Sequence, residues 1–129
     1  MDFREWIIIG LIVVFIVSRF IPVKGITNIT TGEAKQKMDG KNIQFIDVRT
    51  PGEYNRDHQK PFRNIPLYEL ASRVRELDRS KEVVVICQSG IRSAKATRVL
   101  KRKGFDRIAN VKGGMKALRK NESENEAAR

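Results

Sequence analysis

One segment of the sequence has the residue types and spacing of a reactive thiol. It reads Cys87-Gln-Ser-Gly-Ile-Arg-Ser93 and follows the apolar run Val83–Ile86. Where such a loop leaves a strand and enters a helix, its backbone N–H groups converge on one point and favour negative charge there. Gly90 allows the turn because it has no Cβ. The positive end of the helix is expected to lower the pKa of the Cys87 thiol and to hold it as a thiolate.

A thiolate held by N–H donors is a nucleophile that needs no histidine base, so we predict Cys87 as the catalytic residue. The alternative is that Cys87 is a small apolar side chain at a strand end, the commoner fate of a free cysteine. Glycine three positions after the cysteine and arginine five positions after it, between a buried strand and a helix, favour the reactive thiol. The predicted substrate-binding positions of the loop are Gln88, Ser89, Gly90, Ile91 and Arg92.

Strands that alternate with helices must position this loop. The sequence predicts short strands and amphipathic helices in alternation, the strands at 43–48, 83–87 and 107–111 and the helices at 67–77 and 93–103. The run 83–86 is continuous and largely β-branched, which is typical of a strand buried on both faces. This order predicts an α/β domain with a mainly parallel sheet, in which ligands bind at the carboxyl ends of the strands.

The composition bounds the class of protein. The chain has 129 residues, with 26 Lys and Arg against 15 Asp and Glu, a net charge of +11 and a sequence pI of about 10.2. One cysteine excludes an intramolecular disulfide and multi-cysteine metal sites, and one histidine argues against a histidine-cluster site. We therefore predict neither a metal nor an organic cofactor. The length allows one globular domain, predicted at 24–118, followed by a polar, disordered tail at 119–129.

The first two dozen residues are interpreted as a membrane anchor. The segment from Trp6 to Val23 is predominantly apolar, and its 18 residues make a helix of roughly 27 Å against a bilayer core of about 30 Å. A cleaved signal peptide would need a basic leading region and a small-residue cleavage site, which the sequence lacks. The excess of lysine and arginine after the segment predicts a single-pass anchor over 1–23, with the C-terminal domain facing the cytoplasm.

The predicted helix at 93–103 and the loop before it carry a row of cations. The simplest interpretation is a solvated helix face, and attraction to anionic lipid headgroups or steering of anionic substrates are two alternatives. Nucleic-acid binding is not expected, since aromatic residues are not interleaved with the basic ones. The cations are Arg92, Lys95, Arg98, Lys101, Arg102 and Lys103.

Several separated motifs, over about residues 26–118, resemble the rhodanese family of single-domain sulfurtransferases. They are Phe45-Ile-Asp-Val-Arg49 with Glu53-Tyr54, His58 with Asn64-Ile-Pro-Leu67, the loop 87–92, and Val111-Lys-Gly-Gly114. The resemblance implies a central parallel sheet with helices on both faces. It also implies that Cys87 accepts a sulfane sulfur as a persulfide and passes it to a thiophilic acceptor, with Arg49 near the active site as a further substrate-binding residue. Asp47 and Arg49 are also expected to form an ion pair that supports the turn after their strand.

The loop departs from the common pattern of that family at Gln88, where many members carry arginine. One cation is thereby missing, which favours a less charged donor, such as a persulfide, over thiosulfate. The loop length also separates the chain from the phosphatases of this fold, which use Cys-x5-Arg. Here Arg92 is five positions after Cys87, which leaves a tighter cradle.

These observations predict a membrane-anchored sulfurtransferase that moves a sulfane sulfur from thiosulfate or a persulfide to a thiol acceptor. The alternative, from a different class, is a non-catalytic binding module of the same fold that recruits a partner to the membrane. The presence of Cys87, Gly90 and Arg92 together favours the enzyme, since a scaffold has no need of this set.

Overall fold

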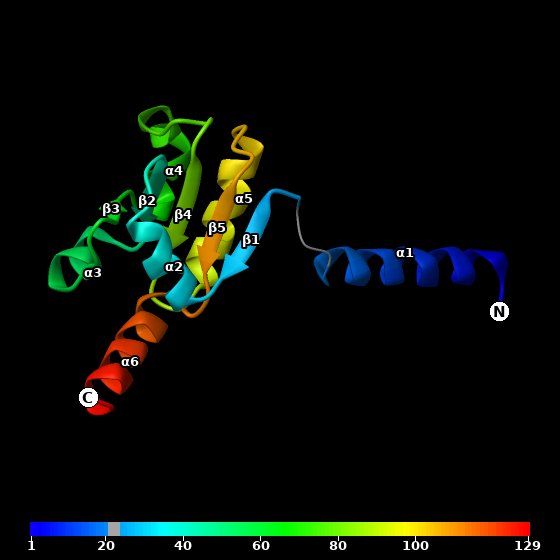
Figure 1. Cartoon of the computed structure of the whole chain (residues 1–129). Helices are drawn as coiled ribbons and strands as arrows, with labels where there is room; N and C mark the ends of the chain where they lie inside the picture. The colour runs from blue at the N-terminus through cyan, green and yellow to red at the C-terminus, as the bar shows by residue number, and fades with distance from the viewer. Residues whose placement is uncertain (21–23) are drawn as a thin grey trace.

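A five-stranded parallel sheet forms the centre of the domain. The computed structural model describes residues 1–20 and 24–129. The strands lie in the order β1-β5-β4-β2-β3, and every neighbouring pair is parallel (Figure 1). Their bounds are Ile26–Ile29 for β1, Ile43–Asp47 for β2, Arg63–Asn64 for β3, Glu82–Ile86 for β4 and Ile108–Val111 for β5.

Helices cover both faces of this sheet. Their bounds are Thr31–Met38 for α2, Pro51–Arg56 for α3, Leu67–Arg73 for α4, Ile91–Arg102 for α5 and Gly114–Ala127 for α6, and a 3-10 turn, η1, spans Val74–Glu76. Val83 and Val85 of β4 pack in one apolar cluster with side chains of α4 and α5. Val84 and Ile86 pack in a second cluster with side chains of α2 and α6. Because alternate residues of a strand face opposite sides, the two clusters lie on opposite faces of the sheet.

The central position of β4 explains its sequence. Its four apolar residues, Val83 to Ile86, are 0–1% exposed, because the strand is covered on both faces and paired on both edges. The prediction of an α/β domain with a parallel sheet is therefore confirmed. Cys87 follows β4 at its carboxyl end, in the middle of the sheet edge where ligands bind in such folds.

The C-terminal segment is ordered further than the sequence predicted. The expected disordered tail at 119–129 is helical to Ala127, as the continuation of α6. Arg119 holds this part of the helix to the domain through the Asp57 carboxylate at 2.8 Å, and it also binds Glu122 at 2.9 Å on its own helix. The polar composition misled the prediction because these polar side chains bind one another and the loop after α3.

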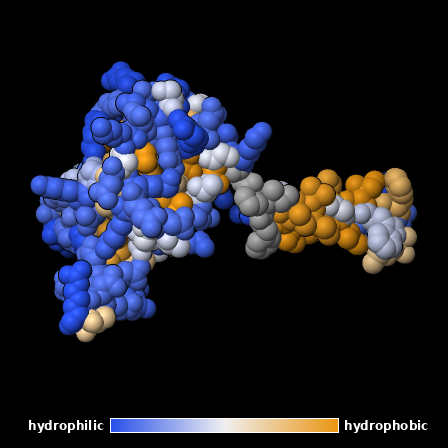
Figure 2. Space-filling view, viewed as in Figure 1, coloured by the Kyte–Doolittle hydropathy of each residue, from blue (hydrophilic) through white to orange (hydrophobic). Residues whose placement is uncertain are grey.

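The N-terminal helix α1 (Phe3–Phe20) corrects the predicted membrane anchor. Its apolar side chains are exposed, and Figure 2 shows them as a hydrophobic rod beside a largely hydrophilic domain. Within residues 1–20 and 24–129, no helix combines the length and the apolarity that crossing a bilayer requires. The reason lies in the charges Arg4, Glu5 and Arg19, which leave only thirteen residues between Glu5 and Arg19, or about 20 Å of helix. The predicted single-pass anchor, and the cytoplasmic orientation derived from it, are thus not supported; its last residues, 21–23, lie outside the described part.

Candidate active site

The loop after β4 encloses the sulfur atom of Cys87. The Gly90 N–H donates to Cys87 Sγ over 3.0 Å, and Ser93 Oγ lies 3.3 Å from the same sulfur. Gly90 adopts φ 102°, a left-handed conformation that side chains with a Cβ rarely take, and α5 begins directly after it. Cys87 as a residue is 0% exposed. The conformation of the loop therefore decides which molecules reach Sγ.

The surroundings of Cys87 favour its ionised form. Burial raises the pKa of the Cys87 thiol, since it disfavours the charged thiolate. Hydrogen bonds with the Ser93 side chain and with the backbone N–H groups of Ser93, Gly90 and Ser89 outweigh this effect, and the pKa lies below its usual range. The cradle predicted from the loop sequence is thus present, and it is built mainly of backbone donors at the start of α5.

A buried asparagine, which the sequence analysis missed, completes the inner wall of the site. Ser93 Oγ lies 2.5 Å from Asn110 Oδ1 and gives it its single proton beside a neutral thiol, whereas beside a thiolate that proton turns to the sulfur; Asn110 Nδ2 donates to Asn28 Oδ1 at 3.2 Å. Asn110 lies on β5, is 6% exposed and fixes the position of the Ser93 hydroxyl beside the sulfur. The signal in the sequence was a single polar residue inside the apolar strand Ile-Ala-Asn-Val, where a buried amide needs a partner.

The start of α6 holds the loop from the other side. The Met115 N–H donates to the Cys87 carbonyl at 2.8 Å, and the Lys116 N–H donates to the Gln88 carbonyl at 3.1 Å. These contacts need close approach, because a Cβ at Gly114 would lie 2.2 Å from the Cys87 carbonyl oxygen. Gly114 also has φ 58°, in the left-handed region. Gly114 is therefore required by the geometry of the Cys87 loop.

Replacement of Gly114 by alanine tests this contact. We expect Gly114→Ala to lower the free energy of unfolding by at least about 2 kcal/mol, because the left-handed backbone is strained with a Cβ and the methyl group meets the Cys87 carbonyl. Gly52→Ala is the matched control, since its Cβ would meet nothing within 4 Å and it lies in α3; it should change stability by less than about 1 kcal/mol. Urea unfolding followed by far-UV circular dichroism measures both, and equal effects of the two substitutions would contradict the assignment.

The main partner of Arg92 is Glu53 and not the Cys87 sulfur. Its Nη1 and Nη2 atoms donate to the two carboxylate oxygens of Glu53, at 2.6 and 2.8 Å. Glu53 also accepts from Thr50, with which it forms the capping box that begins α3. These hydrogen bonds, that of Arg92 first, hold the pKa of Glu53 down at about 2 although burial opposes the shift. The pair joins the start of α5 to α3 and so fixes the far side of the Cys87 loop.

The Glu53–Arg92 pair predicts a pH-dependent contribution to stability. We expect Glu53→Gln to cost about 1–2 kcal/mol at pH 7, where the carboxylate is ionised and paired. Because the pKa of Glu53 is lowered from 4.5 to about 2 in the folded chain, this contribution is complete above pH 4.5 and is lost as the pH falls towards 2. Urea unfolding of both proteins at pH 7 and near pH 2 measures the difference. A cost that is the same at both pH values would refute the pair as its source.

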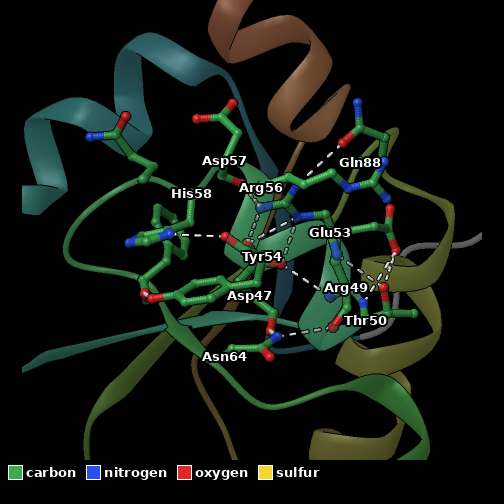
Figure 3. A network of polar contacts seen from close by, with 12 residues as sticks. Asp47, Arg49, Thr50, Glu53, Tyr54, Arg56, Asp57, His58, Asn64 and Gln88 are labelled. Atoms are coloured by element: carbon green, nitrogen blue, oxygen red, sulfur yellow. Dashed lines mark hydrogen bonds and ion pairs between the residues drawn. The ribbon is translucent and has the colours of Figure 1, made fainter.

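A buried ion pair supports the loop from the neighbouring strand (Figure 3). Asp47, the last residue of β2, is completely buried and accepts from Arg49 Nη2 at 2.8 Å and Nε at 3.0 Å. Arg49 Nη1 lies 3.4 Å from Gln88 Oε1, and Nη2 donates to the Asp57 carbonyl at 2.6 Å. The expected Asp47–Arg49 pair is thus confirmed, and Arg49 lies behind the first residue after the cysteine. Its role in substrate binding stays a prediction.

Polar side chains of α3 and of the segments beside the Cys87 loop line a hollow at the surface. It has a volume of about 350 Å³ and is lined by Arg49, Glu53, Arg56, Asp57 and Gln88. His58 stacks on the Tyr54 ring, with 4.1 Å between ring centroids, and its Nδ1 bonds the Tyr54 carbonyl at 2.9 Å, which is a structural arrangement. Figure 3 shows these side chains in one network around Arg49. The described residues contain no group of three or more His, Cys, Asp or Glu side chains that could hold a metal ion.

Of the seven predicted site residues, some surround the Cys87 sulfur and others do not. Cys87, Ser89 and Gly90 lie in the cradle with the sulfur, whereas Gln88 faces Arg49 and Arg92 faces Glu53. Ile91 is 70% exposed and lies on the outer surface beside the loop. What the arrangement offers is a buried, ionisable thiol under backbone N–H donors, with two buttressing ion pairs on one side and α6 on the other.

Comparison with known proteins agrees with this geometry. The family described as Rhodanese-like domain matches residues 30–121. The chain is 40% identical over 83 residues to the putative sulfur carrier protein YrkF of Bacillus subtilis. The match covers 64% of this chain and 45% of that protein, so the chain spans less than half of YrkF. It is 35% identical over 76 residues to the thiosulfate sulfurtransferase PspE of Escherichia coli, covering 57% of this chain and 72% of that protein.

A solved structure shows the same fold. The crystal structure of a rhodanese-like domain protein from Staphylococcus aureus superposes with a TM-score of 0.67 at 32% sequence identity, covering 71% of this chain and 90% of that one. The family match at residues 30–121 begins directly after β1 and contains strands β2 to β5 and the Cys87 loop. The similar proteins thus include some that are named for sulfur transfer.

Proposed function

Because this chain belongs to the rhodanese-like domain family, we propose that it is a sulfurtransferase in which Cys87 carries the transferred sulfur. The observation that supports this most directly is the buried Cys87 Sγ under the Gly90 N–H at 3.0 Å, with a pKa below its usual range. A thiolate is the form that attacks a sulfane sulfur, and the same donors stabilise the terminal sulfur of a persulfide. The relative named as a thiosulfate sulfurtransferase adds support for the reaction class.

The two half-reactions balance without a cofactor. With thiosulfate, the Cys87 thiolate attacks the sulfane sulfur, a new S–S bond forms, and the old S–S bond breaks as sulfite leaves with its electron pair. With an alkyl persulfide, the alkyl thiol leaves instead and takes the proton. An acceptor thiolate then attacks the outer sulfur of the Cys87 persulfide, forms the acceptor persulfide and returns the Cys87 thiolate.

The chain's own residues hold the Cys87 loop in position for these steps. Gly90 and Ser93 hold the sulfur, and Asn110 fixes Ser93. The Glu53–Arg92 and Asp47–Arg49 pairs support the loop on one side, and each guanidinium is neutralised by its carboxylate. A residue that touches only the loop, as Asn110 does, is a positioning residue.

Substitutions of Gln88 test the proposal, because the charge at this position should change the rate of sulfur loading from thiosulfate more than that from a persulfide. This side chain is exposed and directly follows Cys87, so a cation in its place would attract a thiosulfate dianion to the loop. We expect Gln88→Arg to raise the rate of sulfur loading from thiosulfate by about tenfold at low salt, and Gln88→Glu to lower it by a similar factor. Loading from an alkyl persulfide, which carries at most one negative charge, should change less than about threefold in both variants.

The measurement is single-turnover loading of the full chain, followed by intact mass. Since both variants change the same exposed side chain, they control for each other. A rate with thiosulfate that is the same in both variants would show that the charge at position 88 does not select the donor. Absence of loading from either donor in the unmodified, folded chain would contradict the sulfurtransferase function itself.

A further inference from the structure

Two large apolar side chains are exposed beside the Cys87 loop. Among residues 24–129, Tyr68 is 72% exposed and Ile91 is 70% exposed, and no other large apolar side chain in this range is exposed. Ile91 is the first residue of α5 and Tyr68 the second residue of α4. Tyr68 lines one hollow together with Arg92, the residue that follows Ile91, and tyrosine is enriched where a partner protein binds.

Two hollows lie beside these residues, one at the starts of α4 and α5 and one along α5. The first has a volume of about 310 Å³ and is lined by Val48, Thr50, Leu67, Tyr68 and Arg92. The second has a volume of about 680 Å³ and is lined by Leu67, Lys95, Arg98, Val99, Lys101 and Arg102. Leu67 lines both, so the hollows adjoin each other and extend from the flank of the Cys87 loop along α5.

The charge of this surface has one sign. Helix α5 contains five lysine or arginine residues and no acidic residue. Of these cations, Arg92 pairs with Glu53 and Lys101 with Asp106, whereas no ion pair is found for Lys95, Arg98 or Arg102 among the described residues. Ile91, Lys95, Arg98 and Arg102 follow one another at helical spacing and lie along one stripe of α5.

We propose that this surface docks a small acidic protein that carries the acceptor thiol, an inference that rests on the sulfurtransferase function proposed above. We define the docking face as Leu67, Tyr68, Ile91, Lys95 and Arg98. The stripe from Ile91 to Arg102 is roughly 16 Å long, which exceeds a small thiol but suits a protein surface. The apolar side chains next to the loop favour a protein partner, because protein interfaces have an apolar core. A nucleic acid would need several aromatic side chains for base stacking among the cations, and Tyr68 is the single exposed one on this surface among the described residues. The unpaired cations select an acidic partner and speed its encounter.

Peptide acceptors of opposite charge test this docking directly. One peptide has the sequence acetyl-Glu-Leu-Glu-Cys-Glu-Leu-Glu-amide, and its twin has lysine at each glutamate. The full chain is first loaded with sulfur, and the rate of transfer to each peptide thiol is measured at low salt and in 1 M NaCl. Flanking charges also change the pKa of the peptide thiol, so each rate is divided by the rate with a small alkyl persulfide in place of the protein. We expect a normalised preference of about tenfold for the acidic peptide at low salt, falling to about twofold or less in 1 M NaCl.

Two variants assign the preference to the docking face. Lys95→Glu/Arg98→Glu should lower the rate with the acidic peptide by about tenfold, and Tyr68→Ala should lower it at high salt as well as at low salt. All three side chains are exposed, so the fold should be kept. The matched control is Lys41→Glu/Arg75→Glu, which makes the same change of charge at two exposed cations outside the docking face. It should leave the preference within about twofold of the unmodified chain.

The outcomes separate this inference from the function on which it rests. Transfer to 2-mercaptoethanol should be unchanged in the docking-face variants, and its absence in the unmodified chain would contradict the sulfurtransferase function. Normal transfer to 2-mercaptoethanol without preference for the acidic peptide would overturn the docking proposal alone. So would equal loss in the control variant. Two competitors are also added to the transfer reaction with the acidic peptide: an oligonucleotide of equal charge, and the same peptide with its cysteine replaced by serine. Stronger inhibition by the oligonucleotide than by the serine peptide would also overturn the docking proposal, because the surface would then bind polyanions in general.

Discussion

Replacement of Cys87 by serine is expected to abolish sulfur transfer while the fold is kept. The serine hydroxyl occupies nearly the same volume in the loop and can keep the contacts with Gly90 and Ser93, which lie 3.0 and 3.3 Å from Sγ. It is not ionised at neutral pH and cannot carry a sulfane sulfur as a persulfide. We therefore expect a loss of at least about 1,000-fold in the rate of transfer from thiosulfate or a persulfide.

The measurement is the rate of thiocyanate formation from cyanide, with thermal unfolding followed by circular dichroism as the test of the fold. Cys87 is the only cysteine in the chain, so no other thiol of the chain can replace it. A folded Cys87→Ser protein that keeps more than about a tenth of the activity would show that sulfur moves by a route independent of this residue.

Removal of the Asp47 carboxylate is expected to be the most destabilising of the substitutions considered. Asp47 is 0% and Arg49 3% exposed, and Asp57 and Gln88 add contacts to the same guanidinium. Asp47→Asn leaves a buried cation without its counter-charge, which costs about 3–5 kcal/mol in comparable cases. Because Arg49 also reaches Gln88, the variant should further slow sulfur loading.

The control uses a pair of the same type at the surface. Lys37 and Glu82 are 2.8 Å apart, with side chains that are partly exposed, so Glu82→Gln should cost less than about 1 kcal/mol. The double variant Asp47→Asn/Arg49→Met should recover part of the loss, since it removes both charges. Urea unfolding is followed by far-UV circular dichroism, because the single tryptophan, Trp6, lies in α1 outside the domain. A cost of Asp47→Asn no greater than that of Glu82→Gln would contradict a buried, supporting ion pair.

Local patterns were sufficient for the centre of the fold. The run from Val83 to Ile86 is typical of a strand covered on both faces, and its position predicted Cys87 at the carboxyl edge of the sheet, where the structure has it. The cradle also followed from short-range features, namely Gly90 and the start of a helix. In each case the information lies within a few residues of the position predicted.

The features that the sequence did not predict depend on contacts between distant segments. Asn110 meets Ser93 across 17 residues, and Arg92 meets Glu53 across 39, so neither partner is visible in a local window. The order of the C-terminal helix depends in the same way on Arg119 and Asp57, 62 residues apart. The predicted membrane anchor is not supported, because in the described residues the apolar stretch of α1 is bounded by the charges of Glu5 and Arg19.

The most direct test of the account is the intact mass of the full chain after exposure to thiosulfate and, separately, to an alkyl persulfide. We predict the gain of one sulfur atom on Cys87, its removal by cyanide with formation of thiocyanate, and no gain in Cys87→Ser. No gain from either donor, in a folded chain whose Cys87 thiol reacts with an alkylating agent, would contradict it. The Cys87 loop would then be a preserved binding element of the fold and not the carrier of a transferred sulfur.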